Sequence, residues 1–421
     1  MTAVPDRAAR PFDVVVYGAT GFTGRLVAEH LLANYGASSD VEADVNWAMA
    51  GRNSDKLAKV RAEIGALDDL PLITASADDH PSLREMCFQT RVVLSTVGPY
   101  QLYGEPLIAA CAETGTDYVD LCGEPAWMAA MIAKYDDAAK ASGARIVFSC
   151  GFDSIPFDHG VWFLQQHAKE RFGAPCPRVK GRVRRMKGAF SGGTAASMLA
   201  TYKAAAADPQ LRAALADPFA LTPGFKGPAQ PLGGRAAYDA ASRSWAAPFV
   251  MAPINTKNVH RSNALMRHAY GQDFVYDEMM LTGDGPKGQG RAKAAERDSR
   301  LQAIALALPP TRAVIARFFL PKPGEGPSKQ ERETGYYDIL LVGEAADGRT
   351  IRASVKGDKD PGYGSTSKMI AESALCLAKD VPREMTPGGI WTAAAAMGGA
   401  LIARLEARAG LTFALEDDQA G

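Results

Sequence analysis

Residues 13–24, with the sequence DVVVYGATGFTG, decide the fold of this chain. Three consecutive valines predict a buried strand of a parallel sheet, because β-branched side chains favour such strands. Gly18, Gly21 and Gly24 follow at three-residue spacing, which allows a sharp turn, a close approach of backbone to a pyrophosphate and tight packing of the next helix. A helix over 22–33 would then point its positive end at the phosphates. The pattern predicts a dinucleotide-binding turn rather than a tight turn without a ligand.

The composition is that of a globular protein without strong overall charge. The chain has 421 residues, which suits two domains, and its 47 basic residues balance its 47 acidic ones. No overall field then attracts nucleic acid or an anionic membrane. The six cysteines form no CxxC pair, which favours reduced thiols in a cytoplasmic protein and argues against a metal site of the zinc type. The first residues lack the apolar segment of a signal peptide.

Two apolar stretches, 301–320 and 388–403, need to be weighed as membrane segments. Prolines and arginines interrupt the first, and the second is rich in alanine and glycine. Neither reaches the roughly 20 consecutive apolar residues that a span requires, so we expect no transmembrane segment. Peripheral lipid contact through 315–320 remains an alternative to a core or interface helix.

Strand-like and helix-like runs alternate through the first 150 residues, which predicts βαβ units and a Rossmann-type parallel sheet. Strands are expected at 46–50, 72–75, 91–97, 118–121 and 145–150, with helices at 54–64, 81–87, 105–114 and 126–142. After about residue 160 the pattern changes. Expected strands at 178–187, 274–281, 336–342 and 350–355, the last two joined by an Asp347-Gly348 hairpin turn, predict a mostly antiparallel sheet.

The expected fold class is therefore α/β, with a Rossmann-type domain and an inserted α+β domain. We place the NADP-binding domain at 1–160 and expect C-terminal helices within 361–421 to complete it. The inserted α+β domain is placed at 161–360. Residues 284–290, with the sequence DGPKGQG, are expected to form a loop or linker.

The end of the second expected strand favours NADP(H) over NAD. The sequence there is Ala-Gly-Arg-Asn-Ser, and it lacks the carboxylate that holds the ribose hydroxyls in NAD-binding relatives of the fold. Arg52 offers a bidentate fork for the additional phosphate, and Ser54 offers a hydroxyl and a helix N-cap. The alternative is that Arg52 is a solvated loop residue.

Ligands of open parallel sheets bind at the carboxyl ends of the strands, where three loops are expected to converge. These loops are 96–100, 120–124 and 151–156. A catalytic acid or orienting group for hydride transfer should come from this rim. The candidates are Tyr100, Tyr103, Asp153, Asp158 and His159. Each has a structural alternative: Asp153 or Ser154 as a helix cap, Tyr103 in the core, and His159 as a packed helix residue.

We predict Tyr100 and Asp153 as the catalytic residues. A proton would come from Tyr100 or from water ordered by Asp153. The predicted cofactor-binding residues are Gly18, Thr20, Gly21, Phe22, Thr23, Gly24, Arg52, Ser54, Thr96, Val97, Gly98 and Pro99. No tyrosine in the chain has a lysine four residues later, so the YxxxK mechanism of short-chain dehydrogenases is excluded.

Four basic residues alternate along the strand expected at 178–187 and share one of its faces. They are Arg178, Lys180, Arg182 and Arg184. We favour a solvated sheet face that discourages edge pairing. The alternative is a landing surface for an acyl carrier or another acidic partner.

The whole chain resembles the saccharopine dehydrogenase-like oxidoreductases. The shared motifs are GATGFTG at 18–24, AGR at 50–52, TVGPYQLYGEP at 96–106, GTDYVDLCGEP at 115–125, CGFDSIPFD at 150–158, SGGT at 191–194, MAPINT at 251–256, RSNAL at 261–265 and the late TPGGIWTAAAAMG. The resemblance is strongest to the branch of trans-acting enoyl reductases. It implies an NADPH-dependent reductase of an enoyl or acyl intermediate in lipid or polyketide assembly. It also implies a homodimer in which the substrate and dimerisation domain is the one at 161–360.

Two other functions stay open on the sequence. One is a non-catalytic NADP-binding protein that anchors partners. The other is a true saccharopine-type amino-acid dehydrogenase, although such enzymes carry a GLDPG turn where this chain has GFDSIP at 151–156. Only Tyr100, Asp153 and Asp158 carry over from that group, as residues of the substrate pocket.

Overall fold

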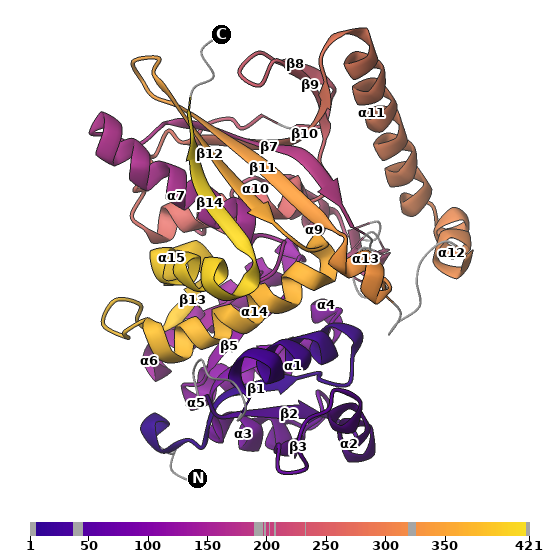
Figure 1. Ribbon diagram of the computed structural model, residues 1–421, viewed down its shortest axis with the longest axis vertical. Helices are drawn as coiled ribbons and strands as arrows, with labels where there is room; N and C mark the ends of the chain where they lie inside the picture. The colour runs from indigo at the N-terminus through magenta and orange to yellow at the C-terminus, as the bar shows by residue number, and fades with distance from the viewer. Residues whose placement is uncertain are drawn as a thin grey trace. The chain divides into compact units, whose positions relative to one another are not determined.

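The structure is a computed structural model that describes residues 6–36, 45–188, 197, 199–201, 203–205, 208–231, 233–318 and 326–417. The chain divides into two compact units, each described here by itself (Figure 1). The first unit comprises Met1–Phe152, Gly324–Gly326 and Gly362–Ala409. The second comprises Asp153–Pro323, Pro327–Pro361 and Gly410–Gly421.

A parallel sheet forms the centre of the first unit. Its strands are β1 (Phe12–Tyr17), β2 (Trp47–Gly51), β3 (Leu72–Thr74), β4 (Thr90–Ser95), β5 (Asp117–Val119), β6 (Arg145–Val147) and β13 (Gly389–Trp391). They lie in the order β13-β6-β5-β4-β1-β2-β3, and every pair is parallel. The order from β3 to β6 is that of the Rossmann fold, which confirms the predicted fold class.

The helices of this unit cover a sheet whose strands are hydrophobic on both faces. They are α1 (Phe22–Tyr35), α2 (Ser54–Glu63), α3 (His80–Phe88), α4 (Tyr100–Tyr103), α5 (Glu105–Thr114) and α6 (Pro125–Ser142), each within a few residues of its predicted range where one was predicted. Val14, Val15 and Val16 of β1 are fully buried, as a central parallel strand requires.

The C-terminal part of the chain returns to this sheet. Helix α14 (Thr366–Leu375) packs against α1, as Figure 1 also shows. The buried carboxylate of Glu372 accepts hydrogen bonds from the Tyr35 hydroxyl at 2.9 and 2.8 Å and lies 2.7 Å from His30 Nε2. A π-helix, η3 (Cys376–Asp380), follows, and α15 (Ala393–Arg404) and η4 (Leu405–Ala409) end the unit. The fold therefore joins the two ends of the first unit by a buried polar contact.

A mixed sheet forms the centre of the second unit. Its order is β14 (Leu411–Glu416), β12 (Thr350–Gly357), β11 (Tyr336–Glu344), β7 (Arg178–Lys187), β10 (Val275–Gly283), β9 (Ser244–Pro248) and β8 (Ala237–Asp239). Only β7 and β10 pair in parallel; the other pairs are antiparallel. This confirms the prediction of a mostly antiparallel second sheet.

Helices α7 (Ile155–Phe172) and α10 (Ala252–Leu265) pack against this sheet and against each other. Gly160 permits the close approach of α7, because a Cβ there would lie 2.8 Å from a methyl of Leu341 and 2.9 Å from one of Val355. The remaining elements of the described chain are η1 (Arg7–Ala9), α9 (Pro209–Ala216), α11 (Gly285–Ala307), α12 (Pro309–Phe318), α13 (Lys329–Glu333) and η2 (Pro361–Ser365).

Two expectations about local structure were wrong, and one strand was not predicted. Residues 411–416 were expected within the helical completion of the first domain, but they form β14 and pair with β12 of the second sheet. Residues 284–290 were expected as a loop, yet Asp284 caps α11 and the helix runs through the glycines. Residues 389–391 form β13, which was not predicted because three residues are too few to show a strand period.

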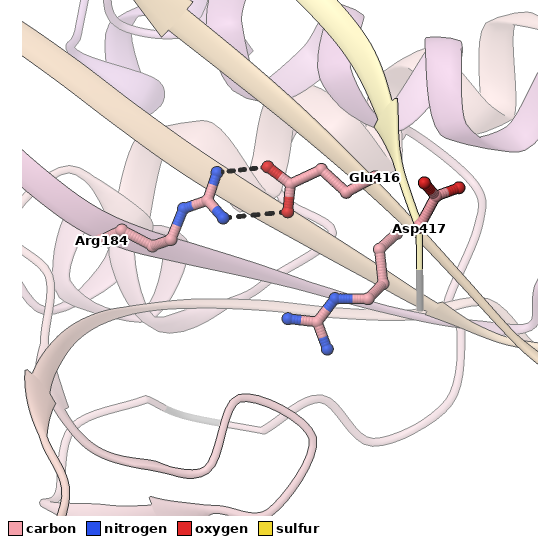
Figure 2. A pocket seen from close by; sticks show the side chains of 4 residues that line it. Arg184, Glu416 and Asp417 are labelled. Atoms are coloured by element: carbon pink, nitrogen blue, oxygen red, sulfur yellow. Dashed lines mark hydrogen bonds and ion pairs between the residues drawn. The ribbon is translucent and has the colours of Figure 1, made fainter. Parts of the chain in front are cut away.

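The basic residues of β7 are paired within the chain rather than solvated. The pairs are Arg178 with Asp277, Lys180 with Glu344, Arg182 with Asp239 and Asp277, and Arg184 with Asp338 and Glu416. Figure 2 shows the two parallel hydrogen bonds from Arg184 to Glu416, at the edge of a recess of about 480 Å³ that Arg352 and Asp417 also line. The recess carries two cations and two carboxylates, so this face offers an acidic partner no excess of positive charge.

Candidate functional site

The glycine turn of the first unit brings β1, α1 and the loop after β4 together. Gly18 has φ +92°, a region that favours glycine, and a Cβ there would lie 2.8 Å from Thr96 Oγ1 and from Val97 Cγ2. A Cβ on Gly24 would lie 2.2 Å from the carbonyl oxygen of Gly18. The predicted roles of the first and third glycines therefore have a steric cause in this turn.

The start of α1 is built for an anion. Its N-cap is Gly21, which has extended backbone, and no side chain caps this end of the helix in the described chain. The amide of Gly21 donates to the Gly18 carbonyl at 2.9 Å, which fixes the turn. The ring of Phe22 packs edge-on against that of Tyr363 at 5.0 Å. The uncapped positive end and the side-chain-free turn fit the pyrophosphate of a dinucleotide, with Thr20 and Thr23 in the same turn.

The residues after β2 fit the 2′-phosphate of NADP. Arg52 is exposed and takes part in none of the ion pairs found in the described residues. Burial, and then the charge of Asp78, raise the pKa of Tyr17 at the end of β1 to about 12, and the positive charge of Arg52 opposes this rise. The predicted N-cap was wrong: Asn53 accepts from the Lys56 amide at 2.8 Å, and Ser54 is the first helical residue.

The loop from Thr96 to Pro99 is held from both sides. The amide of Thr96 donates to the Tyr17 carbonyl at 3.0 Å, and its hydroxyl lies 3.3 Å from the Gly18 carbonyl. On the other side, the buried carboxylate of Glu124 accepts from the amides of Tyr100 at 3.1 Å and Gln101 at 2.8 Å. Glu124 therefore fixes the loop in which Val97, Gly98 and Pro99 were predicted to approach the cofactor.

The hydroxyl of Tyr100 is fully engaged within the first unit. It donates to the Ser95 carbonyl at 3.1 Å and accepts from the Leu121 amide at 3.1 Å. The side chain is buried beside Trp127, and burial raises the pKa of the hydroxyl well above its usual value. This geometry gives Tyr100 a structural role, tying the loops after β4 and β5 to each other.

Asp153 opens the second unit, directly before α7. Its carboxyl group is partly buried and forms no hydrogen bond or ion pair with the residues that the structure describes. Burial raises its pKa to about 7. Ser154 occupies the N-cap position without a capping hydrogen bond, and its hydroxyl accepts from Asn258 Nδ2 at 2.8 Å. Neither Asp153 nor Ser154 therefore makes a side-chain capping bond to the helix among the described residues.

A polar cluster next to Asp153 was missed by the sequence analysis. Glu278 of β10 is fully buried and accepts from Asn255 Nδ2 and from the Tyr276 hydroxyl, each at 2.9 Å. Burial, and then the charges of Asp277 and Asp153, raise the pKa of Glu278 well above its usual value, which favours the protonated acid.

Helix α10 supplies the amides of this cluster. Asn255 and Asn258 are buried, and their Oδ1 atoms have no hydrogen-bond partner among the described residues. Ser262, one turn further along the same face, donates to Asp158 Oδ1 at 2.6 Å. The signal was present in the motifs MAPINT and RSNAL together with Asn258 between them, since positions 255, 258 and 262 share one face of a helix.

The other sequence candidates lie in different surroundings. Tyr103 is 45% exposed, so it is not a core residue. Asp158 is buried on α7 and bonded to Ser262. His159 is fully buried, and burial lowers its pKa to about 3, which keeps the imidazole neutral. The SGGT motif at 191–194 lies outside the described residues.

The chain matches a known domain family and several proteins along its length. The family described as saccharopine dehydrogenase NADP binding domain matches residues 14–147. A putative trans-acting enoyl reductase of Mycobacterium tuberculosis is 41% identical over 428 aligned positions, which cover 97% of both chains. A trans-acting enoyl reductase of Mycobacterium bovis is 39% identical over 415 positions, covering 94% of this chain and 96% of that one.

Two solved structures share the fold at low sequence identity. The apo saccharopine dehydrogenase (L-Glu forming) of Saccharomyces cerevisiae has a TM-score of 0.51 at 12% identity, over 96% of this chain and 99% of the other. The homospermidine synthase of Legionella pneumophila, solved in complex with NAD, has a TM-score of 0.51 at 8% identity, over 96% and 91%. At these identities the likeness concerns the fold alone.

Proposed function

The chain belongs to the trans-acting enoyl reductase family, with a saccharopine dehydrogenase-type NADP-binding domain, and from this we propose that it reduces an enoyl thioester with NADPH. The residues of the glycine turn, Arg52 and the loop after β4 would hold the cofactor. One observation supports the proposed chemistry. The carboxyl group of Asp153 has a pKa of about 7 and no hydrogen-bond or ion-pair partner in the described chain.

The reaction requires one proton from the protein. NADPH, when bound by the glycine turn and the loop after β4, would supply the hydride for the β-carbon. The electron pair of the double bond then takes a proton at the α-carbon, and we assign that proton to the carboxyl oxygen of Asp153. Asp153 is left as a carboxylate, which solvent reprotonates. A carboxyl group with a pKa near 7 suits this task, because both of its forms are populated at neutral pH.

Tyr100, the other predicted catalytic residue, is a weaker donor on the same argument. Its only proton is committed to the Ser95 carbonyl, and its pKa is raised by burial. Releasing that proton would leave a buried phenolate against a backbone carbonyl, at a high electrostatic cost. The proposal therefore gives proton donation to Asp153 and the shaping of the cofactor loop to Tyr100.

NADPH oxidation by purified protein tests this function. The loss of absorbance of NADPH would be followed with enoyl thioesters of increasing chain length, with saturated thioesters as the control for the double bond. Turnover with the enoyl series alone is expected. If the native protein binds NADPH but oxidises it with no enoyl thioester of any chain length, the catalytic proposal fails. The chain would then be a cofactor-binding protein without this chemistry.

Three finer assignments belong to the same proposal. We infer that the acyl substrate is delivered on a carrier, that the protein works as a homodimer and that it acts in the cytoplasm. The family membership supports the acyl substrate, and six buried cysteines without a disulfide in the described chain support a reducing compartment. Comparing carrier-bound with free thioesters, and measuring mass in solution by light scattering, would test the first two.

A further inference from the structure

Helix α11 changes character halfway along its length. Its first half packs against β9 and β10, as Figure 1 shows, and Glu296 there accepts from the Ala236 amide at 2.9 Å. From Arg297 onward the side chains are mostly exposed, and α12 continues the chain after Pro309. The second half is therefore a helix whose length the packing on the sheet does not require.

Three large apolar side chains are exposed along this second half and directly after it. Leu301 is 57% exposed, Ile304 57% and Leu308 51%. Leu301 and Ile304 share one face of the helix, and Leu308 is the C-cap residue directly after it; the three are called here the exposed stripe. Leu306 points to the opposite side and is buried. Isolated exposed leucines are ordinary, but three such neighbours indicate a surface that something covers.

The charge beside the stripe selects the kind of partner. Helix α11 carries five basic and two acidic residues. Arg297 lies one turn before Leu301 on the same face, where it pairs with the exposed Asp298 at 3.0 Å. Arg300 borders the stripe. Between 297 and 314 the sequence has three arginines and one acidic residue, Asp298, so the segment keeps a net positive charge. A second copy of this chain would place these cations against themselves, so the charge pattern favours an anionic surface.

The chemistry of the stripe favours lipid over an acidic protein. Protein interfaces are enriched in tyrosine and tryptophan and use directed hydrogen bonds. The segment 299–314 has no aromatic residue, and the hydroxyl of Thr311 donates to the backbone of its own segment, at Ala305 and Leu308. An exposed apolar face bordered by arginines is the pattern of helices that lie in the headgroup region of a bilayer.

We propose that the second half of α11 docks the protein on the surface of an anionic lipid bilayer, with Leu301, Ile304 and Leu308 inserted among the acyl chains and Arg297 and Arg300 at the headgroups. None of the helices in the described chain is long and apolar enough to pass through a membrane. The contact is therefore peripheral. The inference does not depend on the enoyl reductase proposal.

Vesicle sedimentation of the full chain tests the inference. We expect binding to vesicles of mixed phosphatidylcholine and phosphatidylglycerol and much weaker binding to phosphatidylcholine alone. The variant L301S/I304S/L308S should lose at least about tenfold in partitioning to the mixed vesicles. The variant R297Q/R300Q should lose at least about fivefold, on the anionic vesicles only and less at high salt, because Arg300 contributes about a fivefold factor while Asp298 partly compensates the charge of Arg297.

A matched control removes equally exposed apolar groups elsewhere. The variant L67S/V250S/M385S changes residues that are 65%, 55% and 78% exposed outside α11, and it should bind vesicles as the native chain does. Equal loss in this control would overturn the inference, as would no binding of the native chain to either vesicle. Concentration-dependent dimerisation, or binding of an acidic carrier protein, that the stripe variant abolishes without any vesicle binding would also overturn it.

A second readout separates this test from the proposed function. NADPH oxidation with a water-soluble enoyl thioester should be the same in the native chain and in all three variants, because none of the changed residues belongs to the candidate site. Failure of vesicle binding with intact turnover sinks only the membrane inference. Failure of turnover with intact vesicle binding sinks only the reductase proposal.

Discussion

The glycine turn of the first unit and the polar cluster of the second are built by opposite means. In the turn, the geometry is set by side chains that are missing: a Cβ at Gly18 or Gly24 would meet atoms at 2.8 and 2.2 Å. In the cluster, the geometry is set by side chains that are present, such as the amide of Asn255 on the carboxyl group of Glu278 at 2.9 Å. The first kind of site tolerates almost no added atom, and the second depends on protonation.

This difference shows what the glycine turn and the polar cluster can each contribute to a reaction. Backbone amides and a helix end bind phosphate groups but do not exchange protons near neutral pH. The carboxyl group of Asp153, whose pKa burial raises to about 7, does. Cofactor binding should therefore respond to added bulk, and turnover should respond to pH.

The largest expected effect is that of Gly24→Ala. The new Cβ would lie 2.2 Å from the Gly18 carbonyl oxygen, a backbone atom that cannot move without opening the turn. We expect NADPH affinity, measured by calorimetry, to fall at least about a hundredfold. The control is Gly290→Ala, where no atom lies within 4 Å, and which should leave affinity unchanged. Native affinity in Gly24→Ala would mean that the turn does not hold the cofactor.

The second effect is that of Asp153→Asn on turnover. Removing a proton donor should lower kcat by roughly a hundredfold and leave the affinity for NADPH intact. The donor must be protonated, and its pKa is about 7, so kcat/KM of the native enzyme should be level in acid and fall as pH rises through 7. Asp158→Asn keeps the oxygen that accepts from Ser262 and should change kcat little. A pH profile that Asp153→Asn leaves unchanged would remove Asp153 from the mechanism.

Arg52→Gln should have a smaller and more selective effect. Loss of one charged hydrogen-bonding group toward a phosphate should raise the KM for NADPH about tenfold. NADH does not carry this phosphate, so the KM for NADH should not change. Steady-state kinetics with both cofactors checks this, and an equal rise for both would show that Arg52 does not read the phosphate.

Tyr100→Phe is expected to have the smallest effect on catalysis. The hydroxyl bonds two backbone groups, so its loss should cost about 1–2 kcal/mol in the free energy of unfolding. We expect kcat to change by less than about threefold. Denaturant titration and kinetics on the same preparation separate the two. A large drop in kcat at unchanged stability would restore Tyr100 as the proton donor.

The two units also differ in how far the sequence predicts them. The strands and helices of the first unit lie within a few residues of their predicted bounds, because each βα step is local and its hydrophobic period is clear. The strand at 389–391 was not predicted, since three residues show no hydrophobic period and its partner β6 is far away in the sequence. The geometry of the glycine turn can be predicted from the sequence, because the need for positions without a side chain acts on residues close together in the chain.

The polar cluster could not be assembled from the sequence in the same way. Asp153 precedes Asn255 by more than a hundred residues, and Asn255 and Glu278 lie on different elements, α10 and β10, so nothing in their spacing says that they meet. Burial, which raises the pKa values of both acids, is a property of the packed sheet and not of any local pattern. The basic stripe of β7 shows the same limit, because its acidic partners come from four other strands.

The contact of Glu372 with Tyr35 can form only late in synthesis of the chain. Strand β13 and helix α14 complete the first unit, yet they are synthesised after the whole inserted unit. On the ribosome, the first 152 residues would thus wait with one sheet edge and one helix-covered face unfinished. A gene fragment ending there should yield insoluble product, whereas the same fragment joined by a short linker to 362–409 should be recovered folded.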